Sequence, residues 1–96
     1  MSKKIAVVVR DIDQQYEALR TSLGLLLEMA EVQMIVMDHE IADMNEAYSE
    51  NMEFLDEMEG ERYTTNRENA EKYGFKLINR QEAAALLKEA SIVIPF

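Results

Sequence analysis

Residues 5–9, Ile-Ala-Val-Val-Val, form a continuous run of apolar and mostly β-branched residues near the start of the chain. Charged residues bound this run on both sides, at Lys4 and Arg10. A short run of this kind predicts a strand that is buried on both faces, as the strands of parallel sheets are. Residues 32–37 form a second apolar run of similar length, so we expect a second buried strand there.

The segment between these two runs predicts an amphipathic helix of about five turns. Its apolar residues recur at helical spacing, namely Tyr16, Leu19, Leu23, Leu26, Leu27 and Ala30. Asp11 and Asp13 precede the helix, and either could cap it; Gln14 stands at the capping-box distance from Asp11, and Glu17 follows Asp13 by four residues. A strand, a helix and a second buried strand predict a βαβ unit.

The excess negative charge of the chain is confined to one segment. Of its 19 acidic residues, ten lie within residues 38–61, where no Lys or Arg occurs, while the remainder of the chain carries nine acids and ten bases. Such a surface repels phosphate, so neither nucleic acid nor an anionic membrane is an expected partner. A docking face for a basic partner is one interpretation, but a solvated helix face is the one we favour.

The same acidic segment predicts an amphipathic helix that ends at Gly60. One face of this helix is apolar and consists of Met44, Tyr48, Met52, Leu55 and Met58. The opposite face is acidic and consists of Glu46, Glu50, Glu53 and Glu57.

The last third of the chain predicts three short strands and two helices. Residues 61–65 favour a weak third strand, and Thr65 with Glu68 has the capping-box spacing that opens a short helix closed at Gly74. Residues 75–78 predict a brief strand, and residues 91–94 predict a final buried strand that Pro95 stops. Between them, Ala83, Leu86, Leu87 and Ala90 mark a helix.

Strands that alternate with helices predict a single α/β domain over residues 1–96. We expect an open, mainly parallel sheet of four to five strands with helices on both faces, as in flavodoxin-like folds. The seven Met residues are expected to fill the core. The sequence has no cysteine, which excludes disulfides, thiolate zinc sites and thiol nucleophiles. Because it shows neither a leader nor an apolar run of about 20 residues, we expect a cytoplasmic domain.

Ligands of open parallel sheets bind outside the carboxyl ends of the strands. In this sequence that rule selects residues 10–11, 38–40, 64–66 and 95–96. The candidate ligand rim therefore consists of Arg10, Asp11, Asp38, His39, Thr64, Thr65 and Asn66. A small enzyme or a binder of an anion or metal that uses Arg10, Asp11, His39 and Thr65 is one hypothesis for it.

The individual residues of this rim favour structural roles over chemical ones. His39, the only histidine, could carry a proton or bind a metal, but one His among carboxylates is also a common surface composition. Asp11, Asp13, Asp38 and Glu40 could bind a divalent cation, yet no calcium-loop spacing accompanies them. Thr65 lacks an adjacent general base. We therefore predict no catalytic residue, no metal and no cofactor.

The order of elements resembles the DsrE/DsrF-like family of small sulfur-relay proteins. The second half carries the resemblance with ERYTT, NRENAEKYG, FKLI, NRQEAAALLKEA and SIVIPF, and the first half with KKIAVVVR and VQMIVMDHEI. Active members of that family hold a persulfide on a cysteine at the end of the third strand or in the following turn. That place falls at residues 64–66 here, where Thr64, Thr65 and Asn66 stand instead.

The resemblance implies a scaffold without the family's chemistry, since a hydroxyl or an amide cannot hold a persulfide. We expect a non-catalytic DsrE-like protein, which is either a structural or regulatory subunit or a small-ligand binder associated with sulfur metabolism. The family also implies assembly, so we expect a homo-oligomer of two to six copies or a hetero-oligomer with a DsrE-like homologue. The limited core of a 96-residue open sheet favours the same expectation.

Two other sheet proteins fit the sequence less well. A phosphate-accepting receiver domain needs a lysine after a late strand, but Pro95 and Phe96 stand at the end of the last one. Flavin binding needs a hydroxyl-rich loop after the first strand, and residues 10–13 are instead rich in acid.

Overall fold

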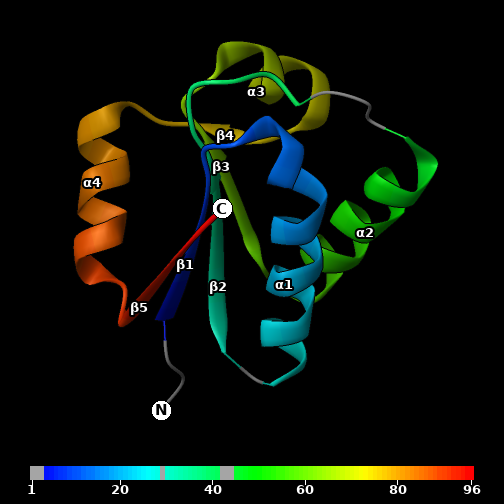
Figure 1. Ribbon diagram of the computed structural model, residues 1–96, viewed down its shortest axis with the longest axis horizontal. Helices are drawn as coiled ribbons and strands as arrows, with labels where there is room; N and C mark the ends of the chain where they lie inside the picture. The colour runs from blue at the N-terminus through cyan, green and yellow to red at the C-terminus, as the bar shows by residue number, and fades with distance from the viewer. Residues whose placement is uncertain (1–3, 29, 42–44) are drawn as a thin grey trace.

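The computed structural model describes residues 4–28, 30–41 and 45–96, in which five strands alternate with helices (Figure 1). The strands are β1 (Lys4–Val9), β2 (Glu31–Val36), β3 (Glu61–Thr64), β4 (Lys76–Leu77) and β5 (Ile92–Pro95). The α-helices are α1 (Gln15–Leu27), α2 (Glu46–Glu57), α3 (Arg67–Tyr73) and α4 (Arg80–Glu89), and a short 3₁₀ helix, η1 (Ile12–Gln14), precedes α1.

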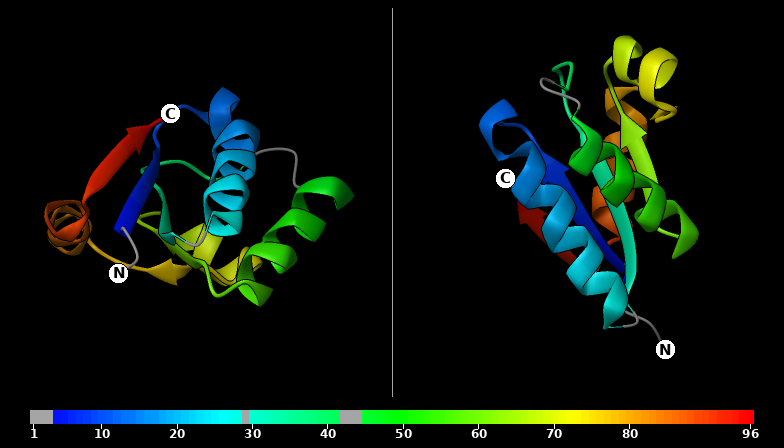
Figure 2. Two further views of the ribbon diagram at one scale, coloured as in Figure 1. Left: turned by 90° about the horizontal axis from the view of Figure 1, so that it is seen from below. Right: turned by 90° about the vertical axis from the view of Figure 1, so that its right-hand side faces the viewer.

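All five strands are parallel and lie in the order β4-β3-β2-β1-β5. The chain moves outward from β1 to β4 and then returns across the sheet, placing β5 on the free side of β1. Because crossovers between parallel strands are right-handed, reversing the direction places the last helix on the opposite face. Figure 2 shows α1 and α2 on one face and α4 on the other. The predicted open parallel α/β fold is confirmed.

Each face of the sheet has its own apolar core. The larger core packs α1 and α2 against alternate residues of the two central strands, including Val7 and Val9 of β1 and Met34 and Val36 of β2. The smaller core packs α4 against the other face and consists of Ile35, Tyr63, Ile78 and Ala83. Val32 to Val36 and Ile5 to Val9 are all buried, as their apolar runs predicted.

The predicted faces of the acidic helix are confirmed within the described residues. Tyr48, Met52 and Leu55 of α2 are buried, whereas its four predicted acidic positions, Glu46, Glu50, Glu53 and Glu57, are exposed. Met44 lies outside the described residues. The buried face of α1 differs from the predicted one. Leu27 at its last turn is 66% exposed, whereas Gln15 and Ser22 are buried.

Three predicted helix ends are placed differently in the structure. Asn66, not Thr65, caps α3, because its side-chain oxygen accepts a hydrogen bond from the backbone N–H of Asn69. Neither aspartate caps α1, which starts after η1; the Asp11 carboxylate instead accepts a hydrogen bond from the backbone N–H of Asp13. The α2 helix ends at Glu57, before Gly60.

The two glycines at the predicted helix ends have different roles. Gly74 has the left-handed backbone that ends α3, with φ of 73°, as predicted. After α2 the left-handed residue is Glu59, with φ of 66°. Gly60 instead lies so close to Leu55 and Leu26 that a Cβ atom there would be 2.8 Å and 2.9 Å from their side chains.

The prediction that the last strand is buried is wrong. β5 pairs with β1 alone and forms an edge of the sheet, so Ile92 and Val93 remain 41% and 44% exposed. Pro95 belongs to the strand, where it lies opposite Val8, and does not stop it. Proline is compatible with an edge strand because that position has fewer backbone hydrogen bonds to satisfy.

No helix in the described part of the chain is long and apolar enough to cross a membrane.

Candidate functional site

The carboxyl ends of β1 and β5 lie side by side and border an open depression of roughly 700 Å³. It is lined by Arg10, Asp11, His39, Pro95 and Phe96. Successive strands leave β1 in one direction up to β4, whereas β5 lies on its other side. The depression therefore lies at the topological switch point of the sheet, where open α/β proteins bind their ligands.

Backbone hydrogen bonds fix the floor of this switch-point depression. The carbonyl oxygen of Phe96 accepts from the N–H groups of Arg10 and Asp11, at 2.8 Å and 3.2 Å, and the N–H of Phe96 donates to Val8 at 2.8 Å. These bonds hold the end of β5 against the start of the loop after β1. The side chain of Arg10 is exposed and has no ion pair or hydrogen bond with any residue in the described ranges.

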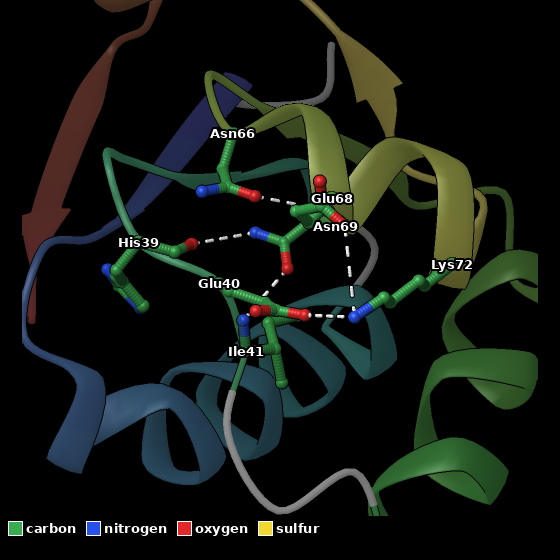
Figure 3. Close-up of polar contacts among 7 residues, drawn as sticks. All are labelled: His39, Glu40, Ile41, Asn66, Glu68, Asn69 and Lys72. Carbon is green, nitrogen blue, oxygen red and sulfur yellow. Dashed lines mark hydrogen bonds and ion pairs between the residues drawn. The ribbon is translucent and has the colours of Figure 1, made fainter.

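His39 contributes the half-buried imidazole of the same depression. Its Nδ1 lies 2.9 Å from the carbonyl oxygen of Met37, which can only accept, so Nδ1 carries a proton. Nε2 is buried and has no hydrogen-bond partner among the residues that the structure describes. In the neutral ring this nitrogen is an acceptor. The ring points away from Asn69, on the opposite side of the 39–41 loop (Figure 3).

Asp38 and Thr65 form the next part of the predicted rim. The N–H of Asp38 donates to Thr65 Oγ1 at 2.8 Å, and that hydroxyl lies 3.3 Å from the Asp38 carboxylate. These bonds hold Asp38 in the left-handed region, with φ of 67°. Arg80, at the start of α4, binds the same carboxylate at 2.9 Å. The contacts of Asp38 and Thr65 thus join the ends of β2 and β3 to the start of α4.

The polar groups of Thr64 and Asn66 are also used inside the fold. Thr64 is fully buried, and its hydroxyl donates to the carbonyl oxygen of Val36 at 2.9 Å. The same hydroxyl accepts from the backbone N–H of Asn66 and from the side-chain amide of Asn69. Since Asn66 caps α3, each residue of the 64–66 turn has a structural role.

No protein-family model matches this sequence, and a search of curated proteins finds no match either.

The predicted rim divides into two parts. Arg10, Asp11 and His39 line the switch-point depression, whereas Thr65 lines a second one of roughly 430 Å³ beside β4 and the start of α4. Arg10, Asp11 and His39 therefore share one depression, and Thr65 lines the other. Within the described residues, no three His, Asp or Glu side chains gather closely enough to hold a metal ion.

Two residues of this region were not predicted. Asn69 is fully buried in α3 and binds the 39–41 loop, which positions His39 (Figure 3). The sequence feature that could have identified Asn69 is a polar residue on the inward face of a short helix. Arg80 follows β4. The rule that ligands bind outside the carboxyl ends of strands would have identified it if it had also been applied to that strand.

An ion pair joins the outside of the 39–41 loop to α3. The ammonium of Lys72 lies 2.6 Å from Glu40 and 3.8 Å from Glu68 (Figure 3). The hydrogen bond to Glu40 and its negative charge raise the pKa of Lys72. Both partners are about half exposed, so the pair contributes little to stability in physiological salt.

Proposed function

We propose that this chain is a non-catalytic DsrE-like protein that binds a small organic acid at the switch-point depression. Its role would be that of a regulatory or structural subunit associated with sulfur metabolism, in the cytoplasm. The observation that carries the proposal is the exposed side chain of Arg10, which lines this depression and has no ion pair or hydrogen bond among the described residues.

The chemistry of the lining selects the class of ligand. A guanidinium binds carboxylate, sulfonate or phosphate oxygens through two parallel hydrogen bonds. Pro95 and Phe96 offer apolar surface to a short carbon skeleton. One carboxylate oxygen of Asp11 accepts a hydrogen bond from the N–H of Asp13. The other oxygen can accept from a ligand, which favours a ligand that carries a hydrogen-bond donor next to its own anionic group. Small zwitterions that combine an acid with an ammonium group fit this arrangement.

The turn at residues 64–66 supports the non-catalytic part of the proposal. In the family that the sequence resembles, this place holds the reactive cysteine. Here the Thr64 and Thr65 hydroxyls and the Asn66 amide all bind neighbouring groups of the fold. A turn that is filled by structural hydrogen bonds has no free nucleophile to offer.

Three small probes test the ligand class by protein NMR. Taurine combines a sulfonate with an ammonium, ethanesulfonate keeps the sulfonate alone, and ethylammonium keeps the cation alone. We expect taurine to shift the amide signals of Arg10, Asp11 and Phe96 most, ethanesulfonate less, and ethylammonium least. Titration to about 10 mM detects millimolar dissociation constants.

Two arginine variants complete this test. Arg10→Gln should abolish the shifts, because it removes the charge and the paired donors. Arg20→Gln is the matched control, since Arg20 is an exposed arginine on α1 outside the depression. Equal binding by wild type and Arg10→Gln, or no shift with either sulfonate, would contradict the proposal.

The proposal includes an assembly of this chain, as a homo-oligomer of two to six copies or with a DsrE-like homologue. An open sheet with an exposed apolar edge at Ile92 and Val93 supports it. Native mass spectrometry of the protein from its own cells distinguishes the two forms. A cysteine-bearing homologue in the complex would mean that this chain is the scaffold for a reactive neighbour, and a monomer would contradict the assembly.

A further inference from the structure

The outer edge of β5 lacks charged residues, which are one of the features that protect a sheet edge, and Pro95 is its last residue. The sequence of β5, Ile-Val-Ile-Pro, contains no charged residue, whereas each of the other four strands contains at least one. The opposite edge, β4, has two residues and carries Lys76. Uncharged edges with open backbone groups pair readily with another strand, so the four-residue β5, rather than the two-residue β4, is the edge of this sheet that is suited to pairing.

Both faces of β5 are also partly uncovered. Ile92 lies opposite Ile5 and so on the α1 face, while Val93 lies opposite Ala6 on the α4 face. Their side chains are 41% and 44% exposed, although Ile5 and Ala6 beside them are buried. A strand added beyond β5 would cover apolar surface on both faces of the sheet.

The distribution of charge favours a second copy of the chain as the occupant. α2 carries five acidic residues and no basic one, so two copies cannot meet there without strong repulsion. α2 and β5 lie at opposite sides of the molecule (Figures 1 and 2). β5 has no charge and the neighbouring α4 has two basic and two acidic residues. The edge therefore selects neither a basic nor an acidic partner.

We propose that a second copy of this chain pairs antiparallel with β5, joining two five-stranded sheets into one continuous sheet. This inference rests on the assembly in the proposed function and names its surface. A two-fold axis beside β5 makes the contact self-complementary, as in most homodimers. It also keeps the two acidic α2 helices at the far ends of the dimer.

A matched pair of charge substitutions tests the interface in the full chain. Val93→Lys places a charge on the β5 edge, and Leu77→Lys places the same charge on the β4 edge at a residue that is similarly exposed, at 45%. Analytical ultracentrifugation should show a wild-type dimer, a dimer for Leu77→Lys, and a dissociation constant raised at least about tenfold for Val93→Lys. Circular dichroism verifies that each variant is folded.

A cysteine scan provides a second measurement that does not depend on a disruptive charge. Because the sequence has no cysteine, single substitutions at Ile92, Val93 and Ile94 report on pairing without background. At least one should form an intermolecular disulfide faster than Leu77→Cys under mild oxidation, since facing Cβ atoms of paired strands are about 5 Å apart.

The outcomes separate this inference from the rest of the proposed function. Oligomers that persist equally in Val93→Lys, without cross-linking through β5, would overturn the β5 interface but leave the assembly standing. A wild-type monomer would overturn the β5 interface and the homo-oligomer together. Taurine binding by the Val93→Lys monomer, measured as above, shows whether the ligand site functions independently of the interface.

Discussion

The side-chain oxygen of Asn69 accepts a hydrogen bond from the backbone N–H of Ile41 at 2.8 Å, across 28 residues of sequence. The amide nitrogen of the same side chain donates to the carbonyl oxygen of His39 at 2.8 Å and to Thr64 Oγ1 at 3.1 Å. One buried amide thus joins α3, the end of β3 and the loop after β2. This loop carries the imidazole that lines the switch-point depression.

Asn69→Ala is expected to lower the free energy of unfolding by about 2–3 kcal/mol, because it leaves the buried N–H of Ile41 without a partner. Urea denaturation measures the change. Asn51→Ala is the control, since Asn51 is half-buried on α2 and makes one long bond of 3.4 Å to Tyr16. Similar losses in the two variants would show that the Asn69 contacts are not the cause.

Two glycine substitutions should change stability in opposite directions. Gly60→Ala places a Cβ atom 2.8 Å from Leu55 and 2.9 Å from Leu26 and should destabilise the fold by about 1–3 kcal/mol. Gly24→Ala lies inside α1 with no atom within 4 Å of the new Cβ, and should stabilise it by about 0.5–1 kcal/mol. Thermal unfolding of both variants tests the prediction, and a shift of the same sign in both contradicts it.

Arg62→Lys should cost about 1–3 kcal/mol of stability. The guanidinium of Arg62 binds both carboxylate oxygens of Asp56 at 2.8 Å and the carbonyl oxygen of Tyr73 at 2.8 Å, and its carbon lies 4.7 Å from the centre of the Phe75 ring. A lysine ammonium cannot reproduce this planar set of contacts. Chemical denaturation gives the free energy.

The control for Arg62 is Arg20→Lys. Arg20 pairs with Glu17 at 3.7 Å, and both side chains are more than half exposed. Its replacement should change stability by less than about 0.5 kcal/mol. A loss at Arg62 no larger than this would mean that the contacts with Asp56 and Tyr73 contribute little.

Local sequence patterns predicted which segments form helices and strands better than they predicted where each strand lies in the sheet. The spacing of Tyr48, Met52 and Leu55 was enough to find the buried face of α2, because that face depends on helical geometry alone. The apolar run at residues 91–94 predicted a strand but not an edge. Whether a strand has one neighbour or two depends on the order of the whole sheet.

The candidate site was also predicted only in part from the sequence. The rule of carboxyl ends brought Arg10, Asp11 and His39 together, since it follows from parallel strands. It did not distinguish the depression of these residues from that of Thr65, because the rule names the ends of the strands and not the shape of the surface between them. The T-x-x-E spacing favoured Thr65 as the cap of α3, but with its hydroxyl bound to Asp38 the adjacent Asn66 caps the helix.

Ionisation of Tyr63 should make the fold less stable at high pH. Burial, the hydrogen bond donated to Glu61 and that carboxylate's charge together raise the pKa of Tyr63 from 10.0 to about 12. Below pH 10 both the folded and the unfolded chain keep the proton, so the contribution is complete. Between pH 10 and about 12 the unfolded chain loses it first, and the free energy of unfolding falls as pH rises. Tyr63→Phe should show a shallower fall in urea denaturation over this range, and identical slopes for the two proteins would contradict the assignment.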